Sequence, residues 1–331
     1  MIITRTPFRI SFFGGGTDYP RWYLKHGGSV LSTTIDKYCY ITCRNLPPFF
    51  EHKHRIVYSH IENVKTLEEI KHPAVAQVLQ WAKIVDGLEI HHDGDLPARS
   101  GLGSSSAFTV GLIHALYGMR GKLAGKERLA LDALHIEQNL IGESVGSQDQ
   151  VAVAHGGFNK INFHRDGAFD VEPVILTIAR REELQSHLML CFTGFSRIAN
   201  EIAKSQIENF DKKEVELLRM REMVDEALNI LSNNQVPIEE FGLLLDQAWK
   251  CKRNLSEQVS TPEIDFIYEE AKRAGAIGGK ILGAGGGGFM LLFAKPEIHA
   301  SIRERLKDLI HVDFKFEDAG SKVVLYQPDG L

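Results

Sequence analysis

Along the first half of the chain, apolar positions recur first with the period of a β-strand and then with the period of a helix. Strand-like segments occupy residues 4–13, 28–46 and 87–96. Two helical segments follow, at residues 105–119 and 125–142, and the first is apolar on nearly all sides, which indicates burial. This half of the chain therefore predicts strands that alternate with helices.

The second half predicts longer helices. A strand over residues 187–195 precedes a long helical stretch between residues 213 and 255. The next helix has a clear beginning, because Thr261 can cap it and Pro262 suits its first position, and Gly275 is placed to end it. The remaining elements are a strand over residues 289–295, a helix over residues 296–310 and two short strands. Together the two halves predict an α+β fold.

Composition and charge exclude several classes of protein. The 331 residues are 44% hydrophobic and 24% charged with a net charge of -5, which is ordinary for a globular protein and argues against a nucleic-acid partner. No apolar run reaches 18 residues, so no membrane span is predicted. The first residues lack the order of a signal peptide, and we therefore expect a cytoplasmic protein.

The cysteines do not indicate a disulfide framework or a zinc site. Four of them are scattered over the chain, and only Cys39 and Cys43 are close together. These two lie on a strand-like run, where reduced, half-buried strand residues are a simpler explanation than a metal pair. No second pair completes a zinc site, since His91 and His92 lie at a strand end before a turn.

Three glycine-rich segments, at residues 14–19, 100–106 and 280–289, are the first candidates for chemistry. The middle one, SGLGSSS, leads directly into the apolar helix. Glycines let backbone amides converge, serines add hydroxyl donors, and a helix N-terminus carries about half a positive charge, so this segment predicts a phosphate site. It is not a Walker A loop, because no lysine follows the second glycine.

The third segment matches the dinucleotide-binding spacing through Gly283, Gly285 and Gly288. That motif requires a strand before the glycines and a helix after them. Here a strand follows the glycines instead, so the dinucleotide interpretation is rejected.

Two acids and one arginine stand out by their surroundings. Glu137 has only apolar neighbours three and four positions away, which indicates either a bound cation or a partner from a distant segment. Asp149 lies in a polar turn, where it is either a capping residue or a functional acid. Arg9 lies within an apolar strand, on the face of Ser11 and Phe13, and needs an anion, either in a structural salt bridge or in a pair with a catalytic carboxylate.

The three glycine-rich stretches resemble, in order and spacing, the three motifs of the GHMP kinase superfamily. They are TPFRISFFGGGTDY, LPARSGLGSSSAF and KILGAGGGGF. The resemblance implies an ATP-dependent phosphotransferase that acts on an alcohol group. It also implies a ribosomal protein S5 domain 2-like N-terminal domain over residues 1–175 and a ferredoxin-like C-terminal domain over residues 176–331, with the active site between them.

The resemblance also assigns roles to residues. It implies Asp149 as the catalytic base and Arg9 as its partner, and Glu137 with Ser104, or Ser105 in its place, as ligands of Mg²⁺. The ATP phosphates are expected on Ser100, Gly101, Leu102, Gly103, Ser104, Ser105 and Ser106. The phosphoryl-transfer loop is expected at Gly283, Ala284, Gly285, Gly286 and Gly287.

The first motif bears on the substrate. Galactokinases carry a Glu-His pair where this chain has Gly15 and Gly16, which argues against galactose. The expected substrate-binding residues are Gly15, Gly16, Thr17, Asp18, Tyr19 and Arg197. The motif resembles the branch that phosphorylates the anomeric position of fucose or of heptose 7-phosphate.

The single kinase unit favours heptose 7-phosphate, whose 1,7-bisphosphate leads to GDP-linked heptose for capsule or lipopolysaccharide. Arg197 is the first candidate for the 7-phosphate, followed by Arg44 and Lys160. The expected partners are MgATP and a sugar phosphate, and a homodimer is compatible with the sequence. The alternatives are an L-fucose kinase or another sugar-1-kinase, and, in another class, a non-catalytic sugar sensor with a kinase fold.

Overall fold

A computed structural model describes residues 1–194 and 199–327, and within them the chain forms two β-sheets. The larger sheet runs in the order β13-β1-β2-β5-β3-β4, with β6 and β12 paired to β2 and β7 paired to β6. Its strands are β1 (Ile2–Phe13), β2 (Gly28–Asn45), β3 (His54–Val57), β4 (Ile61–Val64), β5 (Leu88–Gly94), β6 (Phe158–Phe163), β7 (Phe169–Pro173), β12 (Phe316–Glu317) and β13 (Lys322–Tyr326). The predicted α+β class is confirmed.

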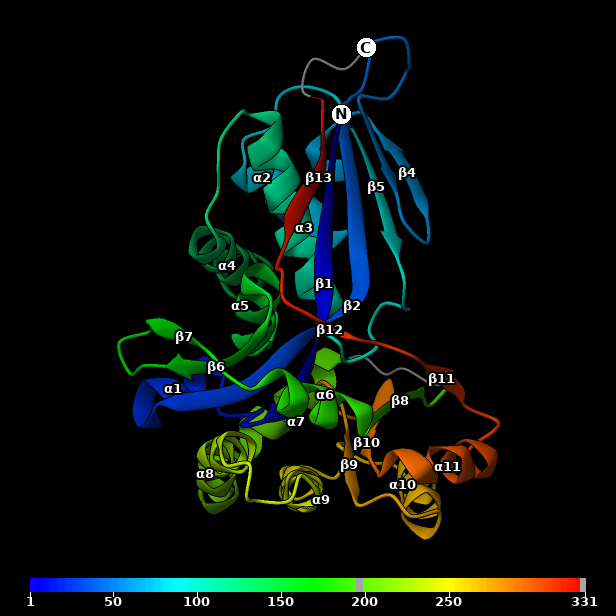
Figure 1. Ribbon diagram of the computed structural model, residues 1–331. Helices are drawn as coiled ribbons and strands as arrows, with labels where there is room; N and C mark the ends of the chain where they lie inside the picture. Colours follow the sequence, from blue (N-terminus) through cyan, green and yellow to red (C-terminus); the bar gives the residue numbers. More distant parts are fainter. Residues whose placement is uncertain (195–198, 328–331) are drawn as a thin grey trace.

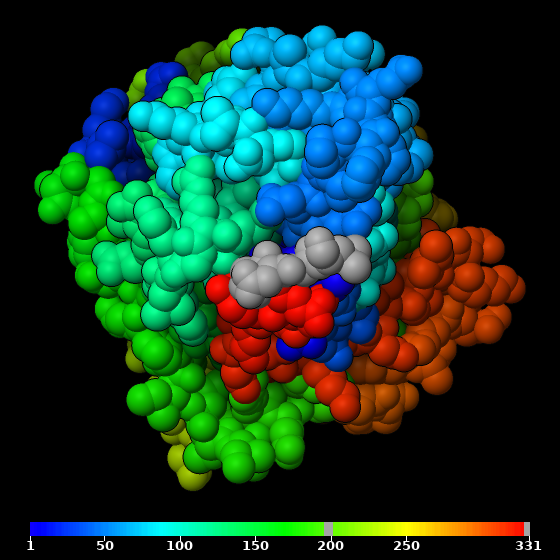
Figure 2. All heavy atoms as spheres, turned by 90° about the horizontal axis from the view of Figure 1, so that it is seen from above, coloured from blue at the N-terminus to red at the C-terminus, as the bar shows by residue number. Residues whose placement is uncertain are grey.

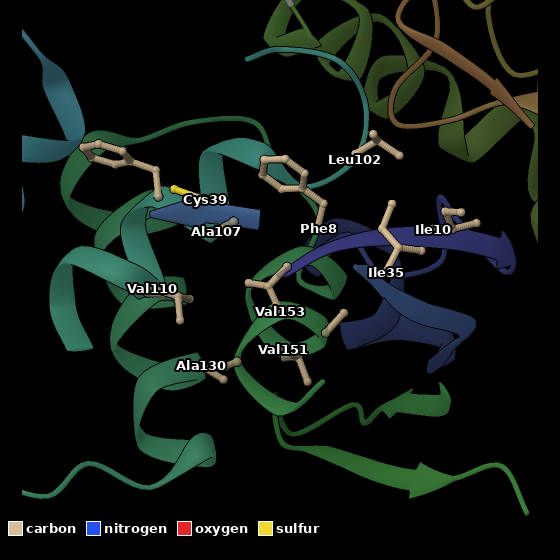
Figure 3. Close-up of a cluster of buried hydrophobic side chains, with 14 of the residues drawn as sticks. Phe8, Ile10, Ile35, Cys39, Leu102, Ala107, Val110, Ala130, Val151 and Val153 are labelled. Atoms are coloured by element: carbon tan, nitrogen blue, oxygen red, sulfur yellow. The ribbon is translucent and has the colours of Figure 1, made fainter. Parts of the chain in front are cut away.

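One group of helices covers the long strands β1 and β2: α3 and α5 pack directly against the strands, and α2 and α4 pack against other helices of the group (Figure 1). These helices are α2 (Pro73–Trp81), α3 (Ser104–Met119), α4 (Lys126–Leu134) and α5 (Gln148–His155), while α1 (Pro20–His26) follows β1. Helix α3 is buried on nearly all sides, as its sequence predicts. Figure 3 shows side chains of α3, α4 and α5, among them Val110, Ala130 and Val153, in one apolar cluster with Phe8 of β1.

The second predicted helix of this group differs from the expectation. Regular α-helix ends at Leu134, and residues His135–Ile141 continue as a π-helix. A wider turn of this kind rotates the side chains that follow it and is frequent at functional sites. Glu137 lies in this π-helical segment.

Strand β1 also departs from strict alternation. The sequence places Phe12 and Phe13 on opposite faces, yet both are buried and both contact Phe241. The pairing of β1 with β2 shifts register between Ser11 and Phe13, and such an irregularity turns the second side chain toward the same core.

The smaller sheet has the order β11-β8-β10-β9 and is antiparallel. Its strands are β8 (Leu188–Phe192), β9 (Gly278–Ile281), β10 (Phe289–Phe293) and β11 (Ile310–Val312). The surrounding helices are α6 (Ile178–Ser186), α7 (Ala199–Asn209), α8 (Glu214–Ser232), α9 (Glu239–Arg253), α10 (Pro262–Arg273) and α11 (His299–Arg305). Short 3₁₀ helices are found at Leu67–Glu69, Phe210–Lys212 and Pro296–Ile298.

Alternate residues of the smaller sheet enter two different cores. Leu190 and Leu291 join the core of the larger sheet, whereas Cys191 and Met290 pack in a separate cluster that includes residues of α10 and α11. Helix α10 begins as predicted, with the Thr261 hydroxyl accepting a hydrogen bond from the amide of Ile264.

The end of the chain returns to the larger sheet. Three short strands follow α11 rather than the predicted two, and the last two, β12 and β13, pair with β2 and β1. Figures 1 and 2 show β13 beside the first residues of the chain. The division into residues 1–175 and 176–331 stays a prediction, to which the topology adds that the last strands belong to the first sheet.

Two exclusions from the sequence can be compared with the described residues. None of the described helices is both long and apolar enough to cross a membrane. Cys39 and Cys43 are free and buried in β2, and no group of three His, Cys, Asp or Glu side chains suited to a metal occurs in the described ranges. Both cysteines lie on a strand, as predicted, but they are fully buried rather than half-buried.

Candidate active site

A pocket of about 310 Å³ lies where the two sheets meet, and all three glycine-rich segments contribute to its wall. The residues that line it are Arg9, Ser11, Gly15, Gly16, Asp18, Tyr19, Arg99, Gly101, Gly103, Ser104, Ser105, Ser106, Glu137, Glu143, Ser144, Val145, Gly146, Gln148, Asp149, Ala203, Gln206, Lys252, Lys280, Gly283 and Ala284. Segments more than 250 residues apart in sequence therefore share one cavity.

The start of α3 forms one wall of this pocket. Gly103 precedes the helix in a left-handed conformation, and as a glycine at the N-cap position it has no side chain to cap the amides of the first turn. Uncapped N–H groups and the helix dipole together attract an anion, as the sequence predicts. Gly101, Gly103 and the three serines Ser104–Ser106 line the cavity.

Two residues of this loop, predicted to bind phosphate, point elsewhere. Leu102 is buried in the core near Phe8 (Figure 3), and its carbonyl accepts a hydrogen bond of 2.9 Å from the amide of Arg9. The carbonyl of Ser100 accepts a bond of 3.1 Å from the amide of Phe289. Neither residue lines the pocket, so both position the loop instead of contacting its contents.

The third glycine-rich loop packs directly against this one. A Cβ added to Gly283 would lie 2.5 Å from the Cα of Gly101. Gly283 and Ala284 line the pocket, but Gly285, Gly286 and Gly287 do not. The amide of Gly286 instead donates to the carbonyl of Val259, so these glycines, predicted for phosphoryl transfer, anchor the loop to the α9–α10 connection.

Arg9 and Asp149 form an ion pair at the floor of the pocket. The Nε and Nη2 atoms of Arg9 lie 2.7 and 2.6 Å from Oδ1 of Asp149, and its Nη1 donates to the carbonyl of Gly101 at 2.7 Å. The Arg9 side chain is 2% exposed and that of Asp149 is 27% exposed. The arginine is thus fixed on three sides of its guanidinium, while the carboxylate keeps access to the cavity.

The first glycine-rich segment brings Asp18 into the same pocket. Its carboxylate accepts hydrogen bonds from the amides of Gly16 and Gln148, and burial raises the pKa of Asp18. Gly15, Gly16 and Tyr19 also line the cavity. Thr17 does not: its hydroxyl donates to the carbonyl of Gly14 and stabilises the turn, so its predicted substrate contact has no support in this geometry.

Glu137 is 1% exposed and has few partners for a buried acid. Its Oε2 accepts hydrogen bonds from the Ser106 hydroxyl, at 2.9 Å, and from the Gln150 amide. Its Oε1 has no hydrogen-bond partner in the part of the chain that the structure describes. Burial raises the pKa of Glu137 to about 7. An orphaned carboxylate oxygen that lines a phosphate pocket suits a hard cation such as Mg²⁺.

The serine beside this carboxylate is not the predicted one. Ser104 accepts a hydrogen bond from the amide of Arg99, whereas Ser106 contacts Glu137. The rotation of a helix explains the difference, since only one of three consecutive residues can face a given neighbour.

Three basic residues were candidates for binding the second phosphate, that of the sugar. Arg44 pairs with Glu89 and Lys160 pairs with Asp225, and neither residue lines the pocket, so the structure gives no support to these two candidates. Arg197 lies outside the described residues.

Two lysines of the pocket are absent from the site residues predicted from the sequence. Lys252 at the end of α9 and Lys280 in β9 both line the pocket, although they are only 6% and 3% exposed. Burial lowers the pKa of Lys252 to about 7 and holds that of Lys280 well below its usual range. A signal existed for Lys280, which interrupts a run of small and apolar residues directly before the glycine loop.

The raised pKa of Glu137 predicts a pH-dependent stability of the ligand-free protein. Because the folded state holds this proton up to about pH 7 and the unfolded state only to about 4.5, the contribution is full below pH 4.5 and falls as pH rises toward 7. The loss amounts to about 3 kcal/mol. Urea unfolding of the wild type and of Glu137→Gln, which cannot ionise, should therefore diverge between pH 5 and 8, with the wild type losing more. Parallel profiles would contradict the assignment.

Two family descriptions match the chain. "GHMP kinases N terminal domain" matches residues 65–157, and "GHMP kinases C terminal" matches residues 237–310. The D-glycero-alpha-D-manno-heptose 7-phosphate kinase of Campylobacter jejuni is 31% identical to the chain, over 97% of the chain and 98% of that protein. The bifunctional fucokinase/GDP-fucose pyrophosphorylase of Arabidopsis thaliana is 28% identical over 93% of the chain and 31% of its own length.

Solved structures show the same fold. A D-glycero-D-manno-heptose 1-phosphate kinase from Bacteroides thetaiotaomicron superposes with a TM-score of 0.77 at 22% identity, over 97% of this chain and 98% of that one. The Lactococcus lactis galactokinase, in complex with galactose, superposes with a TM-score of 0.71 at 18% identity, over 97% of this chain and 94% of that one. At these identities the likeness concerns the fold alone.

Proposed function

The chain belongs to the GHMP kinase superfamily and is an ATP-dependent phosphotransferase, and from this premise we propose that it phosphorylates the anomeric C1 hydroxyl of D-glycero-D-manno-heptose 7-phosphate. The product is then the 1,7-bisphosphate, an intermediate on the way to GDP-heptose for surface polysaccharide. The substrate is supported by the Campylobacter jejuni relative, which carries that substrate in its name and aligns over nearly the whole chain.

One observation supports phosphoryl transfer above all others. The Asp149 carboxylate, held by Arg9, faces the same pocket as the uncapped first turn of α3. Phosphoryl transfer to a hydroxyl group needs a base for the hydroxyl proton and a site for the ATP phosphates, and both must face the same space.

The reaction follows from these positions. The C1 oxygen forms a bond to the γ-phosphorus of ATP, while the bond from that phosphorus to the oxygen bridging it to the β-phosphorus breaks and ADP leaves with the electron pair. Asp149 accepts the hydroxyl proton, and Arg9 keeps the carboxylate oriented toward the cavity. The amides and serines at the start of α3 bind the phosphates of ATP.

Magnesium fits the residues beside this cradle. Glu137, through its orphaned Oε1, and a serine of the loop would hold the ion, and Ser106 is the serine that contacts Glu137. When bound, Mg²⁺ neutralises charge on the ATP phosphates.

The sugar is proposed to bind at the first glycine-rich segment. Asp18 has its carboxylate at the cavity wall and can accept bonds from sugar hydroxyls. A Cβ on Gly15 would lie 3.7 Å from the side-chain nitrogen Nε2 of Gln148 and 3.8 Å from the Ser11 hydroxyl. The absence of a side chain at Gly15 therefore leaves the wall open to Ser11 and Gln148, and this supports a substrate other than galactose.

The other candidates rest on narrower support. An L-fucose kinase is favoured by the Arabidopsis relative, and another sugar-1-kinase stays an alternative within the superfamily. A non-catalytic sugar sensor has no support in the pocket, because Arg9, Asp149 and Glu137 are all present and oriented toward it.

A substrate panel tests the proposal. Heptose 7-phosphate, dephosphorylated heptose, L-fucose and D-galactose are each incubated with MgATP, and ADP release is measured. We expect kcat/KM for heptose 7-phosphate to exceed the others by at least about 100-fold, since a site built for a polar group rejects analogues that lack it. Equal turnover of the unphosphorylated heptose or of L-fucose would overturn the assignment of the substrate.

A further inference from the structure

Two buried lysines at the inner wall of the pocket take no part in the function proposed above. Lys280 projects from β9 in the smaller sheet, and its Nζ donates to the carbonyl of Phe12 in β1, at 2.8 Å. The Nζ of Lys252 donates to the carbonyls of Ile281, at 3.1 Å, and of Gly283. Both side chains line the cavity.

Neither ammonium group has a carboxylate partner within ion-pair distance among the residues that the structure describes. Their contacts are neutral carbonyl oxygens. An ammonium group has three N–H donors, so Lys280 retains two and Lys252 retains one for other partners. Asp18 and Asp149 are the acids whose charges act on Lys252 from a distance. The carboxylate of Asp18 is hydrogen-bonded to backbone amides, and that of Asp149 is paired with Arg9.

Arg9 is a third cationic group beside the two lysines, and it raises the free-energy cost of charging them while the pocket is empty. Burial is the main cause that lowers the pKa of both lysines. Repulsion from Arg9 adds to it for both, and repulsion from Lys252 adds to it for Lys280, while the charge of Asp18 opposes the shift. Buried charges without partners are strongly unfavourable, so this cluster is suited to receive an anion.

The place of the cluster indicates which anion it receives. Lys252 donates a hydrogen bond to the carbonyl of Gly283, and Gly283 packs against Gly101. The carbonyl of Gly101 in turn accepts a hydrogen bond from Arg9, the partner of Asp149. The lysines therefore lie beside the point where the phosphate cradle meets the carboxylate. In the proposed reaction the group at that point is the γ-phosphoryl group during its transfer.

We propose that Lys252 and Lys280 bind the non-bridging oxygens of the phosphoryl group as it passes from ATP to the sugar hydroxyl. This inference rests on the proposed phosphoryl transfer and is independent of which sugar accepts the group. In a loose transition state charge spreads over these oxygens, and preorganised cations in a water-poor site stabilise it.

Two neutral variants, Lys252→Met and Lys280→Met, test the inference. We expect kcat to fall at least about 100-fold in each, with KM for ATP and for the sugar changed less than about threefold, because the contacts strengthen only in the transition state. Lys250→Met is the matched control on α9, since Lys250 is exposed, pairs with Asp246 and does not line the pocket. It should keep full activity.

A second measurement does not depend on turnover or on the identity of the sugar. The wild type should bind tungstate, a mimic of the phosphoryl group, in the presence of MgADP, and each methionine variant should bind it at least about tenfold more weakly by calorimetry. The ligand-free variants should unfold at a temperature close to that of the wild type, because the lost hydrogen bonds to backbone carbonyls are offset by the removal of a buried amine that is costly to charge.

The opposite pattern would overturn the inference. If the variants unfold at lower temperature but keep kcat and tungstate affinity, the lysines are structural ties between backbone segments. Lys280→Gln, which keeps an N–H donor but no charge, guards against a folding defect and should behave as Lys280→Met. If instead no sugar is phosphorylated while tungstate binding still depends on both lysines, the proposed function fails and the anion site stands.

Discussion

Replacing Asp149 by asparagine should abolish turnover while leaving ATP binding nearly intact. The amide oxygen can still accept the two hydrogen bonds from Arg9, so the floor of the pocket keeps its shape. It cannot accept the proton of the sugar hydroxyl. A general base is typically worth 10²–10⁴-fold in rate, and we expect kcat to fall by about this factor. Steady-state kinetics and calorimetry with a non-hydrolysable ATP analogue measure the two effects.

Asp170→Asn is the matched control. Asp170 is an exposed acid on β7 that pairs with His164, far from the pocket wall, and its loss should leave kcat unchanged. If Asp149→Asn kept more than about a tenth of the wild-type rate, base catalysis by this residue would be wrong. Phosphoryl transfer would then depend on positioning and charge alone.

Replacing Gly101 by alanine should separate the two loops on which the pocket depends. A Cβ at this position would lie 2.5 Å from the carbonyl oxygen of Leu282, and the φ angle of +83° is strained for any side chain. Overpacking and left-handed backbone together predict a loss of about 2–5 kcal/mol in the free energy of unfolding. A displacement of about 1 Å in a catalytic loop can cost 100-fold in rate, so kcat/KM should fall by at least about that much.

Gly121→Ala is the control that separates the steric clash of an added Cβ from the backbone strain of a positive φ angle. Gly121 follows α3 with a φ of +62°, and no atom lies within 4 Å of an added Cβ. This control should lose about 1–2 kcal/mol of stability and keep its activity. Equal kcat/KM values for the two variants would show that the close approach of Gly101 to the third loop has no role in the reaction.

Regular elements were predictable wherever local pattern decides them. The burial of α3 and the start of α10 at Thr261 follow from apolar spacing and from capping chemistry, and both are confirmed. The π-helical turn around Glu137 was not predictable, because its effect on the spacing of apolar residues is too small to distinguish it from an α-helix in the sequence. Neither was the return of β13 to β1, which depends on pairing across more than 300 residues.

For the site, the sequence showed which residues carry suitable chemical groups, but it did not show which way their side chains point. An arginine in an apolar strand, an acid among apolar neighbours and serines before a helix are each unusual enough to be noticed, and they lie in one pocket. Whether a loop residue faces the cavity depends on its neighbours, and so the sequence did not show that Leu102 and Thr17 lie away from it. Lys252 was missed because a lysine in the last turn of a helix is ordinarily a solvated residue.

By itself, then, the sequence determined which groups this protein has for phosphate chemistry: three glycine-rich segments, an arginine, two acids and an α+β frame to carry them. Tertiary structure decided that Arg9 meets Asp149 across 140 positions, that Ser106 faces Glu137, and that two lysines without acidic partners in the described chain face the same cavity. The reason is physical. Local pattern records what each residue prefers, whereas ion pairing, burial and the cost of an uncompensated charge depend on neighbours that only the folded chain brings together.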